Sequence, residues 1–227
     1  MSSPAQDPVR VRSGRPFDRL ISFTDAIVAV AITVLVLPIV ELRPRSGEST
    51  VWQVINDNIG QLVTFGFTFI VVAFMWRVHN RIFSRLAGFD DTIFWLNLLW
   101  LLLIVLLPWS SSMYGTGMDM FRVTADAQNW FSGGEGLGGA GLLYWANLGA
   151  ISILGGLITA HARRHPELID EQSPRIFMDS RLVRTRGFIF GVYMVFIGVM
   201  SVLVPIIAVW LPFGFFVIGY FFRKQEA

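Results

Sequence analysis

The apolar residues of this chain come in blocks of about 17 to 22, and this block length constrains the fold more than any other feature. An α-helix rises about 1.5 Å per residue, so a block of this length spans the roughly 30 Å hydrocarbon layer of a bilayer. Of the 227 residues, 54% are hydrophobic and only 15% are charged, whereas charged residues make up about a quarter of an average soluble domain. The sequence therefore predicts an all-α, multi-pass membrane protein.

Six transmembrane helices are predicted, in a single domain that covers residues 1–227. The last two are expected to be separated by a tight turn between Pro205 and Pro212, because proline is tolerated where a helix starts and disfavoured within it. The first is not expected to be a signal peptide, since no small-residue cleavage site follows it. The predicted helices lie at about 17–40, 57–78, 91–112, 140–161, 187–204 and 206–222.

The basic residues are distributed unevenly along the chain. Fifteen of the 18 Lys and Arg residues fall in alternate connecting segments, beginning with the N-terminal one. Because basic residues accumulate on the cytoplasmic side, this pattern predicts a protein of the inner (plasma) membrane with both termini in the cytoplasm. The net charge of +2 is too balanced for a nucleic-acid-binding protein, and without Cys there is neither a disulfide framework nor a zinc-thiolate site.

Two connecting segments contain residues that could bind a phosphate or a metal ion, or could act in catalysis. The glycine-rich one from Met113 to Gly141 lacks the Lys-Ser/Thr pair of a phosphate-binding loop, so a flexible external loop is expected. The basic one after the fourth helix holds His161 and His165, near Glu167. These residues lack a nucleophile and a third metal ligand, so we interpret them as solvated loop residues and predict that the protein is not an enzyme.

Small residues recur every four positions on the fourth and fifth predicted helices. This spacing is typical of helices that approach one another closely in a membrane. The residues are Ser152, Gly156 and Ala160 on the fourth helix and Gly187 and Gly191 on the fifth, where Gly198 returns to nearly the same face.

Polar side chains at membrane depth are few, and each needs a partner or water to offset its desolvation. Arg19 and Asp25 lie six positions apart on the first helix, hence on different faces, and cannot pair with each other. His79 shares a helix face with Trp76 and could dock against the first helix. Asn97 is an amide of the kind that hydrogen-bonds across helix interfaces. A purely structural role for these groups is the alternative to a functional one.

On the first helix, Val30, Thr33 and Leu37 follow the i, i+3, i+7 spacing of a single stripe. If several copies of this helix surround an axis, the stripe forms an apolar collar, a ring of hydroxyls and a second apolar collar. Hydroxyl oxygens can replace part of the water shell of a cation, and apolar collars can gate a pore by dewetting. Alternatively, Thr33 bonds back to the carbonyl of Ala29 and faces protein or lipid.

Three motifs then resemble one family. The segment R-L-I-S-F-T-D, from Arg19 to Asp25, resembles the R-x-x-x-F-S-D signature on the first helix of the lysosomal potassium-channel family, transmembrane protein 175 and its prokaryotic relatives. Residues 76–83 are similar to its second-helix Trp-x-x-His segment, and residues 97–108 to its third-helix Asn-to-Pro stretch. Thr24 stands where the family usually has Ser and keeps the hydroxyl. The last three helices match only in number and length.

The resemblance implies a homotetramer of six-helix subunits with the first helix around a central pore. It implies monovalent cations and the lipid bilayer as partners and no cofactor beyond permeant K⁺, which would pass transiently at Thr33. It also assigns the pore to Val30, Thr33 and Leu37, the stripe that the spacing selects. A polar network behind the pore would comprise Arg19, Phe23, Thr24, Asp25, Trp76, His79 and Asn97.

The predicted function is therefore a passive, potassium-selective cation channel. One alternative is a proton- or ion-coupled secondary transporter that uses Asp25 and His79 as a relay. Its usual marks are inverted repeats and helices broken at mid-span, whereas Pro108 and Pro205 are expected at helix ends and the last three helices carry no second copy of the motif. Another alternative is a membrane scaffold that conducts nothing.

Overall fold

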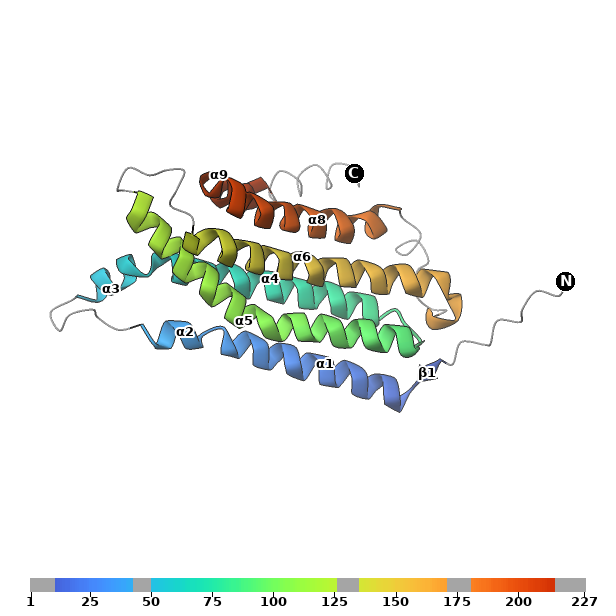
Figure 1. The fold of residues 1–227 in the computed structure, drawn as a ribbon. Helices are drawn as coiled ribbons and strands as arrows, with labels where there is room; N and C mark the ends of the chain where they lie inside the picture. Colours follow the sequence, from blue (N-terminus) through green and yellow to red (C-terminus); the bar gives the residue numbers. More distant parts are fainter. Residues whose placement is uncertain (1–10, 43–49, 126–134, 171–180, 215–227) are drawn as a thin grey trace, which may run out of the picture.

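Long helices running roughly along one direction build this protein (Figure 1). The computed structural model describes residues 11–42, 50–125, 135–170 and 181–214. The long helices are α1 (Arg15–Val34), α4 (Ile59–Phe83), α5 (Asp91–Ala125), α6 (Glu135–Arg164) and α8 (Arg181–Leu203). The shorter elements are β1 (Arg12–Ser13), α2 (Leu37–Val40), α3 (Val51–Asp57), β2 (Gly88–Phe89), η1 (Pro166–Leu168), α9 (Pro205–Trp210) and η2 (Leu211–Phe213).

Four helical stretches are long and apolar enough to cross a membrane: Arg15–Val40, Ile59–Phe83, Asp91–Met120 and Leu137–Arg164. They correspond to the first four predicted spans. The apolar part of α8, Gly187–Leu203, is shorter. The helix α8 ends at Leu203, just before Pro205, but the interval in which the tight turn was expected, Pro205 to Pro212, is occupied by α9 and the start of η2. The predicted sixth span, 206–222, is described only to residue 214, and its remainder lies outside the described residues.

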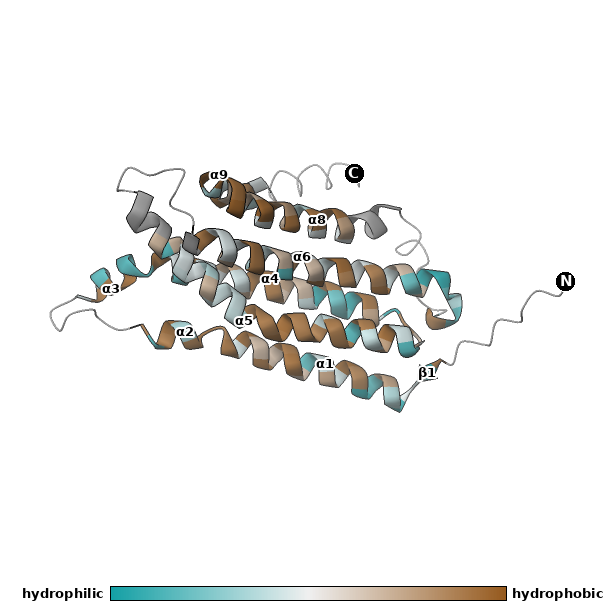
Figure 2. Cartoon of the chain, viewed as in Figure 1, coloured by the Kyte–Doolittle hydropathy of each residue, from teal (hydrophilic) through white to brown (hydrophobic). Residues whose placement is uncertain are grey.

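The long helices form successive layers. In Figure 1, α1 lies along one side of the bundle, α4 and α5 pack next to it, α6 follows, and α8 covers the opposite side. The interior between them is filled by side chains from every long helix, including Val28, Val72, Ile104, Leu148 and Met194. Figure 2 shows hydrophobic residues along the helix shafts and hydrophilic residues near their ends. This distribution is what a bilayer requires of spanning helices.

One end of the bundle gathers the starts of α1 and α5 and the ends of α4 and α6 (Figure 1). There β1 pairs with β2 in antiparallel register, Arg12 opposite Phe89, and Leu86 forms a bridge with Ile169. The Arg12 guanidinium is 2.9 Å from the Asp91 carboxylate and lies over the Phe89 ring. These contacts tie the residues that precede α1 to the connection between α4 and α5.

The predicted flexible loop at 113–141 is wrong over most of its length, because α5 continues to Ala125 and α6 begins at Glu135. Both Asp119 carboxylate oxygens accept backbone N–H groups at the start of α4, from Gly60 at 2.6 Å and Gln61 at 3.2 Å. A Cβ on Gly115 would lie 2.8 Å from Gln61 Cα. Glycine in this segment therefore permits close helix packing. Residues 126–134 lie outside the described residues.

Pro108 was expected at a helix end but lies inside α5. Proline has no N–H to donate to the preceding turn and crowds its carbonyl, and α5 changes direction along its length in Figure 1. The amide of Asn147 on α6 donates to the carbonyl of Leu103 at 3.2 Å and to Ser110 Oγ at 3.3 Å. The Asn147 amide thus attaches α6 to α5 on both sides of the proline.

The small residues of α6 and α8 allow the two helices to approach closely, as their spacing predicted. A Cβ placed on Gly187 would lie 3.5 Å from Gly156 Cα, and one on Gly191 would lie 2.8 Å from the carbonyl oxygen of Gly149 and 2.6 Å from Ile153 Cγ1. Real Cβ atoms do not tolerate contacts below about 3 Å without a shift of the neighbouring atoms. The α6–α8 contact therefore depends on glycine at position 191.

We predict that Gly191→Ala destabilises the protein by about 1–3 kcal/mol, the usual cost of overpacking a well-packed interface. Gly155→Ala is the matched control, because a Cβ on this α6 glycine would meet nothing within 4 Å and alanine favours helix. The thermal unfolding midpoint in one detergent compares the two variants. Equal midpoints for Gly191→Ala and the unmodified protein would contradict the close packing.

Candidate functional site

The stripe on α1 that the sequence selects lies on the outside of the single chain. Val30 is 61% exposed and Leu37 54% exposed, and Thr33 is exposed as well. The Thr33 hydroxyl donates to the carbonyl of Val30 at 2.7 Å, whereas the back-bonded alternative named Ala29 as the acceptor. Because its hydrogen is used in this bond, the hydroxyl presents oxygen lone pairs to its surroundings.

The first predicted helix, 17–40, is not one regular helix. The α-helical pattern of α1 ends at Val34 and resumes in α2 at Leu37. Pro38 has no N–H, so the carbonyl four residues earlier loses its usual donor. The backbone tightens there, with Val36 N–H donating to the Thr33 carbonyl at 3.3 Å. Leu35 and Val36 keep right-handed helical angles, and Leu37 therefore follows Thr33 across a tightened turn.

The opposite face of α1 is buried against its neighbours. Its buried side chains recur at helical spacing and pack toward α4 and α5. They are Phe17, Leu20, Thr24, Val28 and Ala31. Thus α1 has one face that belongs to the subunit interior and another that carries Val30 and Thr33.

A buried chain of hydrogen bonds joins α1 to α5 and α4. The Asn97 amide on α5 donates to Thr24 Oγ1 at 2.9 Å, and Thr24 donates in turn to the carbonyl of Leu20 at 2.9 Å. The Asn97 Oδ1 atom lies 2.8 Å from His79 Nε2 on α4. An amide oxygen can only accept, so Nε2 carries the hydrogen. Thr24 and Asn97 are each 1% exposed, and every bond of this chain is therefore shielded from competing water.

The His79 ring is held between two aromatic side chains. The rings of Phe83 and Trp100 both stack on it, each with its centroid 4.2 Å from the imidazole centroid. A second hydrogen bond lies next to this group: Trp76 Nε1 on α4 donates to Asp25 Oδ1 on α1 at 2.8 Å. Adjacent residues of α1, Thr24 and Asp25, thus hold it to two different helices.

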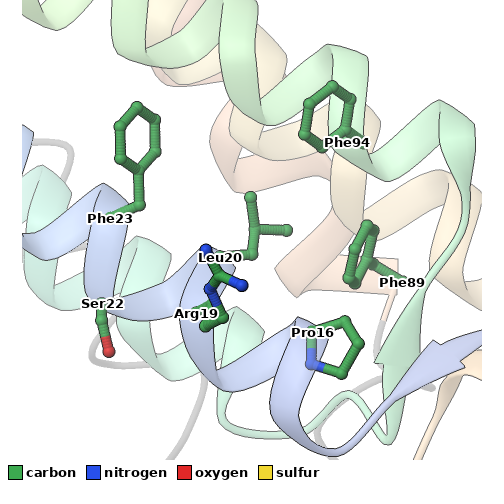
Figure 3. A pocket seen from close by; sticks show the side chains of 7 residues that line it. All are labelled: Pro16, Arg19, Leu20, Ser22, Phe23, Phe89 and Phe94. Atoms are coloured by element: carbon green, nitrogen blue, oxygen red, sulfur yellow. The ribbon is translucent and has the colours of Figure 1, made fainter.

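Two motif residues lie apart from these hydrogen bonds. Arg19 and Phe23 are exposed on α1 and line an open hollow of about 530 Å³ between α1, β2 and the start of α5 (Figure 3). Figure 3 shows Phe23 and Phe94 on either side of Leu20, with Ser22 pointing away. The hollow is lined by Pro16, Arg19, Leu20, Ser22, Phe23, Phe89 and Phe94. The structure thus brings five of the seven expected network residues together and leaves Arg19 and Phe23 on the surface.

The sequence did not reveal one polar pair at the end of the bundle. His161, expected at a basic loop, lies on α6, and its Nε2 is 2.6 Å from Asp90 Oδ2. The other Asp90 oxygen accepts the N–H of Ile93 and caps α5. Although partial burial opposes ionisation, the Ile93 N–H and the His161 ring together hold the pKa of Asp90 below its ordinary value. An aspartate just before an apolar helix is a recognisable capping residue. No sequence signal indicates that His161, 71 residues away, is its hydrogen-bond partner.

The described residues hold no cluster of three or more His, Cys, Asp or Glu side chains that could bind a metal ion. What the arrangement offers is a helix fixed on one face by buried hydrogen bonds and presenting apolar and hydroxyl groups on the other.

Comparison with known proteins finds matches among TMEM175 proteins and bacterial potassium channels. Residues 19–108 match the family model described as endosomal/lysosomal potassium channel TMEM175. A potassium channel of Chamaesiphon minutus is 26% identical over 214 residues, which are 92% of this chain and 94% of that protein. A potassium channel of Streptomyces collinus is 30% identical over 95 residues, 42% of this chain and 46% of its own length. A zebrafish (Danio rerio) endosomal/lysosomal proton channel TMEM175 is 26% identical over 154 residues, 68% of this chain and 26% of its own length.

Two solved structures share the fold. A crystal structure of the Chamaesiphon minutus homologue of the lysosomal potassium-selective channel TMEM175 has a TM-score of 0.68 at 21% identity and covers 94% of this chain and 100% of its own. A variant of the potassium channel MtTMEM175, bound to a nanobody fusion protein, has a TM-score of 0.51 at 16% identity and covers 100% and 99% of the two chains. At these identities the likeness establishes the architecture alone.

The fold and these matches define a multi-pass helical membrane protein with the architecture of TMEM175 channels. Over residues 19–108 the chain matches the model of the TMEM175 family, the family that its first-helix motif resembles. The matched region spans just under half of the Streptomyces relative and about a quarter of the zebrafish one.

We predict that Thr24→Val destabilises the protein by about 1–2 kcal/mol, because it leaves the buried Asn97 amide without its acceptor. Thr24→Ser is the control, since it keeps the hydroxyl and removes one methyl group. Unfolding midpoints in detergent order the three proteins. A valine variant at least as stable as the serine variant would show that the hydrogen bond contributes nothing.

A second prediction concerns pH. A carboxyl group whose pKa is lower in the folded than in the unfolded chain stabilises the fold above its ordinary pKa, and this contribution is lost as the pH falls through the folded value. Asp90→Asn should therefore lower the unfolding midpoint at pH 7, and the difference should shrink as the pH falls below the ordinary aspartate pKa of about 3.9. Asparagine caps helices as well as aspartate does, so the comparison isolates the charge. Asp91→Asn, whose side chain is 75% exposed, is the control and should show a smaller change; a pH-independent difference for Asp90→Asn would refute the assignment.

Proposed function

We propose that this chain forms a passive, potassium-selective cation channel in which α1 helices of several copies surround a central pathway. The observation that carries the proposal is the division of α1 into two faces. One is buried and tied to α4 and α5 by hydrogen bonds, and the other exposes Val30, Thr33 and Leu37. The bacterial relatives named potassium channels support the same function. The proposal takes the assembly as a homotetramer.

The chemistry of the stripe fits a permeant cation. A ring of Thr33 oxygens, each with its hydrogen bonded to the carbonyl of Val30, presents lone pairs that can replace part of the hydration shell of K⁺. The adjacent rings of Val30 and Leu37 carry no polar group, so they offer no compensation for lost water and form the barriers. K⁺ is a passing ligand in this arrangement, and the channel needs no cofactor.

The buried hydrogen bonds have a positioning role in this proposal. A constriction works only if its lining helix stays in register, because small shifts of α1 would change the diameter of each ring. Asn97 and Trp76 hold successive residues of α1 from α5 and α4. In a hydrocarbon environment such bonds have few competitors.

Orientation follows from the basic residues. The described arginines at the start of α1, at the end of α4 and at the end of α6 lie at one end of the bundle (Figure 1). Positive residues favour the cytoplasmic side. The proposal therefore places this end, and both termini, on the cytoplasmic side of the plasma membrane.

A coupled transporter that uses Asp25 and His79 as a relay is the rival function. The zebrafish relative, named a proton channel, makes proton movement worth testing. In the structure Asp25 is bonded to Trp76, and His79 to Asn97, so a relay would require both bonds to rearrange. Saturable uptake driven by a pH gradient would favour the transporter, and a purified protein that passes no ion would favour a scaffold.

The test of the channel is K⁺ flux into liposomes or planar-bilayer recording with purified protein. Thr33→Val should reduce the preference for K⁺ over Na⁺ by about tenfold, corresponding to about 1.4 kcal/mol of lost oxygen coordination. Thr33→Ser keeps the hydroxyl and should retain the preference. Leu37→Ala should raise conductance by removing bulk from a collar. Leu102→Ala, on the exposed face of α5, is its control, and unchanged permeation in both Thr33→Val and Leu37→Ala would remove the stripe from the pore.

A further inference from the structure

The short connection between α4 and α5 is bonded to other segments on both of its sides. On one side, the N–H of Ala87 donates to the carbonyl of Leu168 at 2.9 Å, and the N–H of Asp170 donates to the carbonyl of Arg85 at 3.0 Å. On the other side, β2 pairs with β1, which lies just before α1. The connection therefore links the segment that follows α6 to the start of α1.

A cluster of buried apolar side chains fills the inside of this junction. Phe17 of α1 stacks against Phe83 of α4, with ring centroids 6.2 Å apart, and its centroid lies 6.1 Å from that of Phe89 on β2. Ile158 and Ala162 of α6 belong to the same cluster and are 1% and 0% exposed. The starts of α1 and α5 and the ends of α4 and α6 thus share one packed core at this end of the bundle.

Two adjacent carboxylates hold the junction to its neighbours. Asp91 pairs with Arg12 on β1, and Asp90, which caps α5 through the N–H of Ile93, lies 2.6 Å from His161 Nε2 on α6. The side chains of His161 and Asp90 are only 19% and 9% exposed, so water competes little for this bond. A carboxylate accepts, hence Nε2 carries the hydrogen.

The strength of this bond depends on the charge of the ring. A second proton, on Nδ1 of His161, turns a hydrogen bond from a neutral ring into a charge-assisted ion pair, which is roughly twice as strong. Histidine is the side chain that changes its charge between about pH 5 and 8, and the lowered pKa of Asp90 keeps its carboxylate ionised over this interval.

The other charged groups around His161 do not replace Asp90 as its partner. The ring of His165 lies 4.5 Å from that of His161, but His165 Nδ1 is bonded to Glu167 at 3.1 Å. Arg164, one turn further along α6, opposes a positive charge on the ring. The part of α8 whose side chains are described carries no charged residue. The remaining charged residues on the segments around the pair are Arg12, Arg81, Arg85, Asp91, Arg163 and Asp170.

We propose that Asp90 and His161 are positioning residues for α1, and that protonation of His161 from the cytoplasmic side tightens the attachment of α1. For its effect on permeation this inference rests on the proposed function. Apolar collars gate by dewetting, so a collar conducts when it widens, and an α1 helix held more firmly at its start widens it less. Acidification of the cytoplasmic side should therefore lower K⁺ flux.

The first measurement is backbone hydrogen exchange over residues 12–20 and 86–93 of the purified, assembled protein. His161→Gln keeps an N–H donor for Asp90 and cannot gain a charge, and each comparison with the unmodified protein is made at one pH. At about pH 5.5 we expect both segments to exchange about fivefold faster in His161→Gln, the lower end of the usual coupling between two sites, and at about pH 7.5 we expect equal rates.

The second measurement is K⁺ current in planar bilayers, with the pH of each side set separately. Lowering the cytoplasmic side from about pH 7.5 to about pH 5.5 should reduce the current about fivefold. His161→Gln and Asp90→Asn should both remove this response, since either change prevents the ion pair. His165→Gln is the matched control: it removes the neighbouring histidine, which is bonded to Glu167, and should keep the response.

Four outcomes decide against parts of this assignment. Equal exchange in the unmodified protein and His161→Gln at both pH values would overturn the positioning role. A pH response that His165→Gln abolishes would assign the titration to His165 and Glu167. A response in exchange without one in K⁺ current would overturn the link to permeation. A protein that passes no K⁺ at either pH would refute the proposed channel, while hydrogen exchange would still decide whether the pair positions α1.

Discussion

The cost of burying an unpaired polar group in a hydrocarbon environment is the constraint on which the arrangement of α1 depends. Thr24, Asn97 and His79 each find a partner in one another or in the backbone, and Asp25 is bonded to Trp76. In a bilayer the hydrophobic effect does not hold helices together, so polar bonds and close packing must do so. The α1 helix is attached by hydrogen bonds along one face, and that attachment leaves its other face available.

The other helices are also held together by polar hydrogen bonds and close packing, in proportions that differ from one helix pair to the next. Between α6 and α8 the contact rests on glycine, with backbone atoms approaching closely around Gly149 and Gly191. Between α5 and its neighbours the contact rests on hydrogen bonds between side chains and backbone groups. Asn147 donates to the carbonyl of Leu103, near Pro108, and Asp119 accepts N–H groups at the start of α4. Irregular points of the helices are therefore also their points of attachment.

The sequence predicted the spans better than their ends. Uninterrupted apolar runs are a local signal, and the helices of the first four lie where those runs lie. Along its continuation to Ala125, α5 is attached to α4 by a contact between Asp119 and Gly60, 59 residues apart, which composition alone does not reveal, so a loop was expected. The Val30 and Thr33 stripe was recognisable because its spacing is local. The pairing of Asp90 with His161 was not recognisable, because the two residues are 71 positions apart and no local pattern links them.

The antiparallel pair of β1 with β2 has a mechanical consequence. Arg12 and Ser13 are joined to Phe89 and Gly88 just before α1 begins, and a Cβ on Gly88 would lie 2.6 Å from the carbonyl oxygen of Arg12. Sliding of α1 along its own axis would have to shear this pair and the Arg12–Asp91 contact together. The start of the first helix and the start of α5 are thus joined at this end of the bundle, so an axial displacement of one would be transmitted to the other.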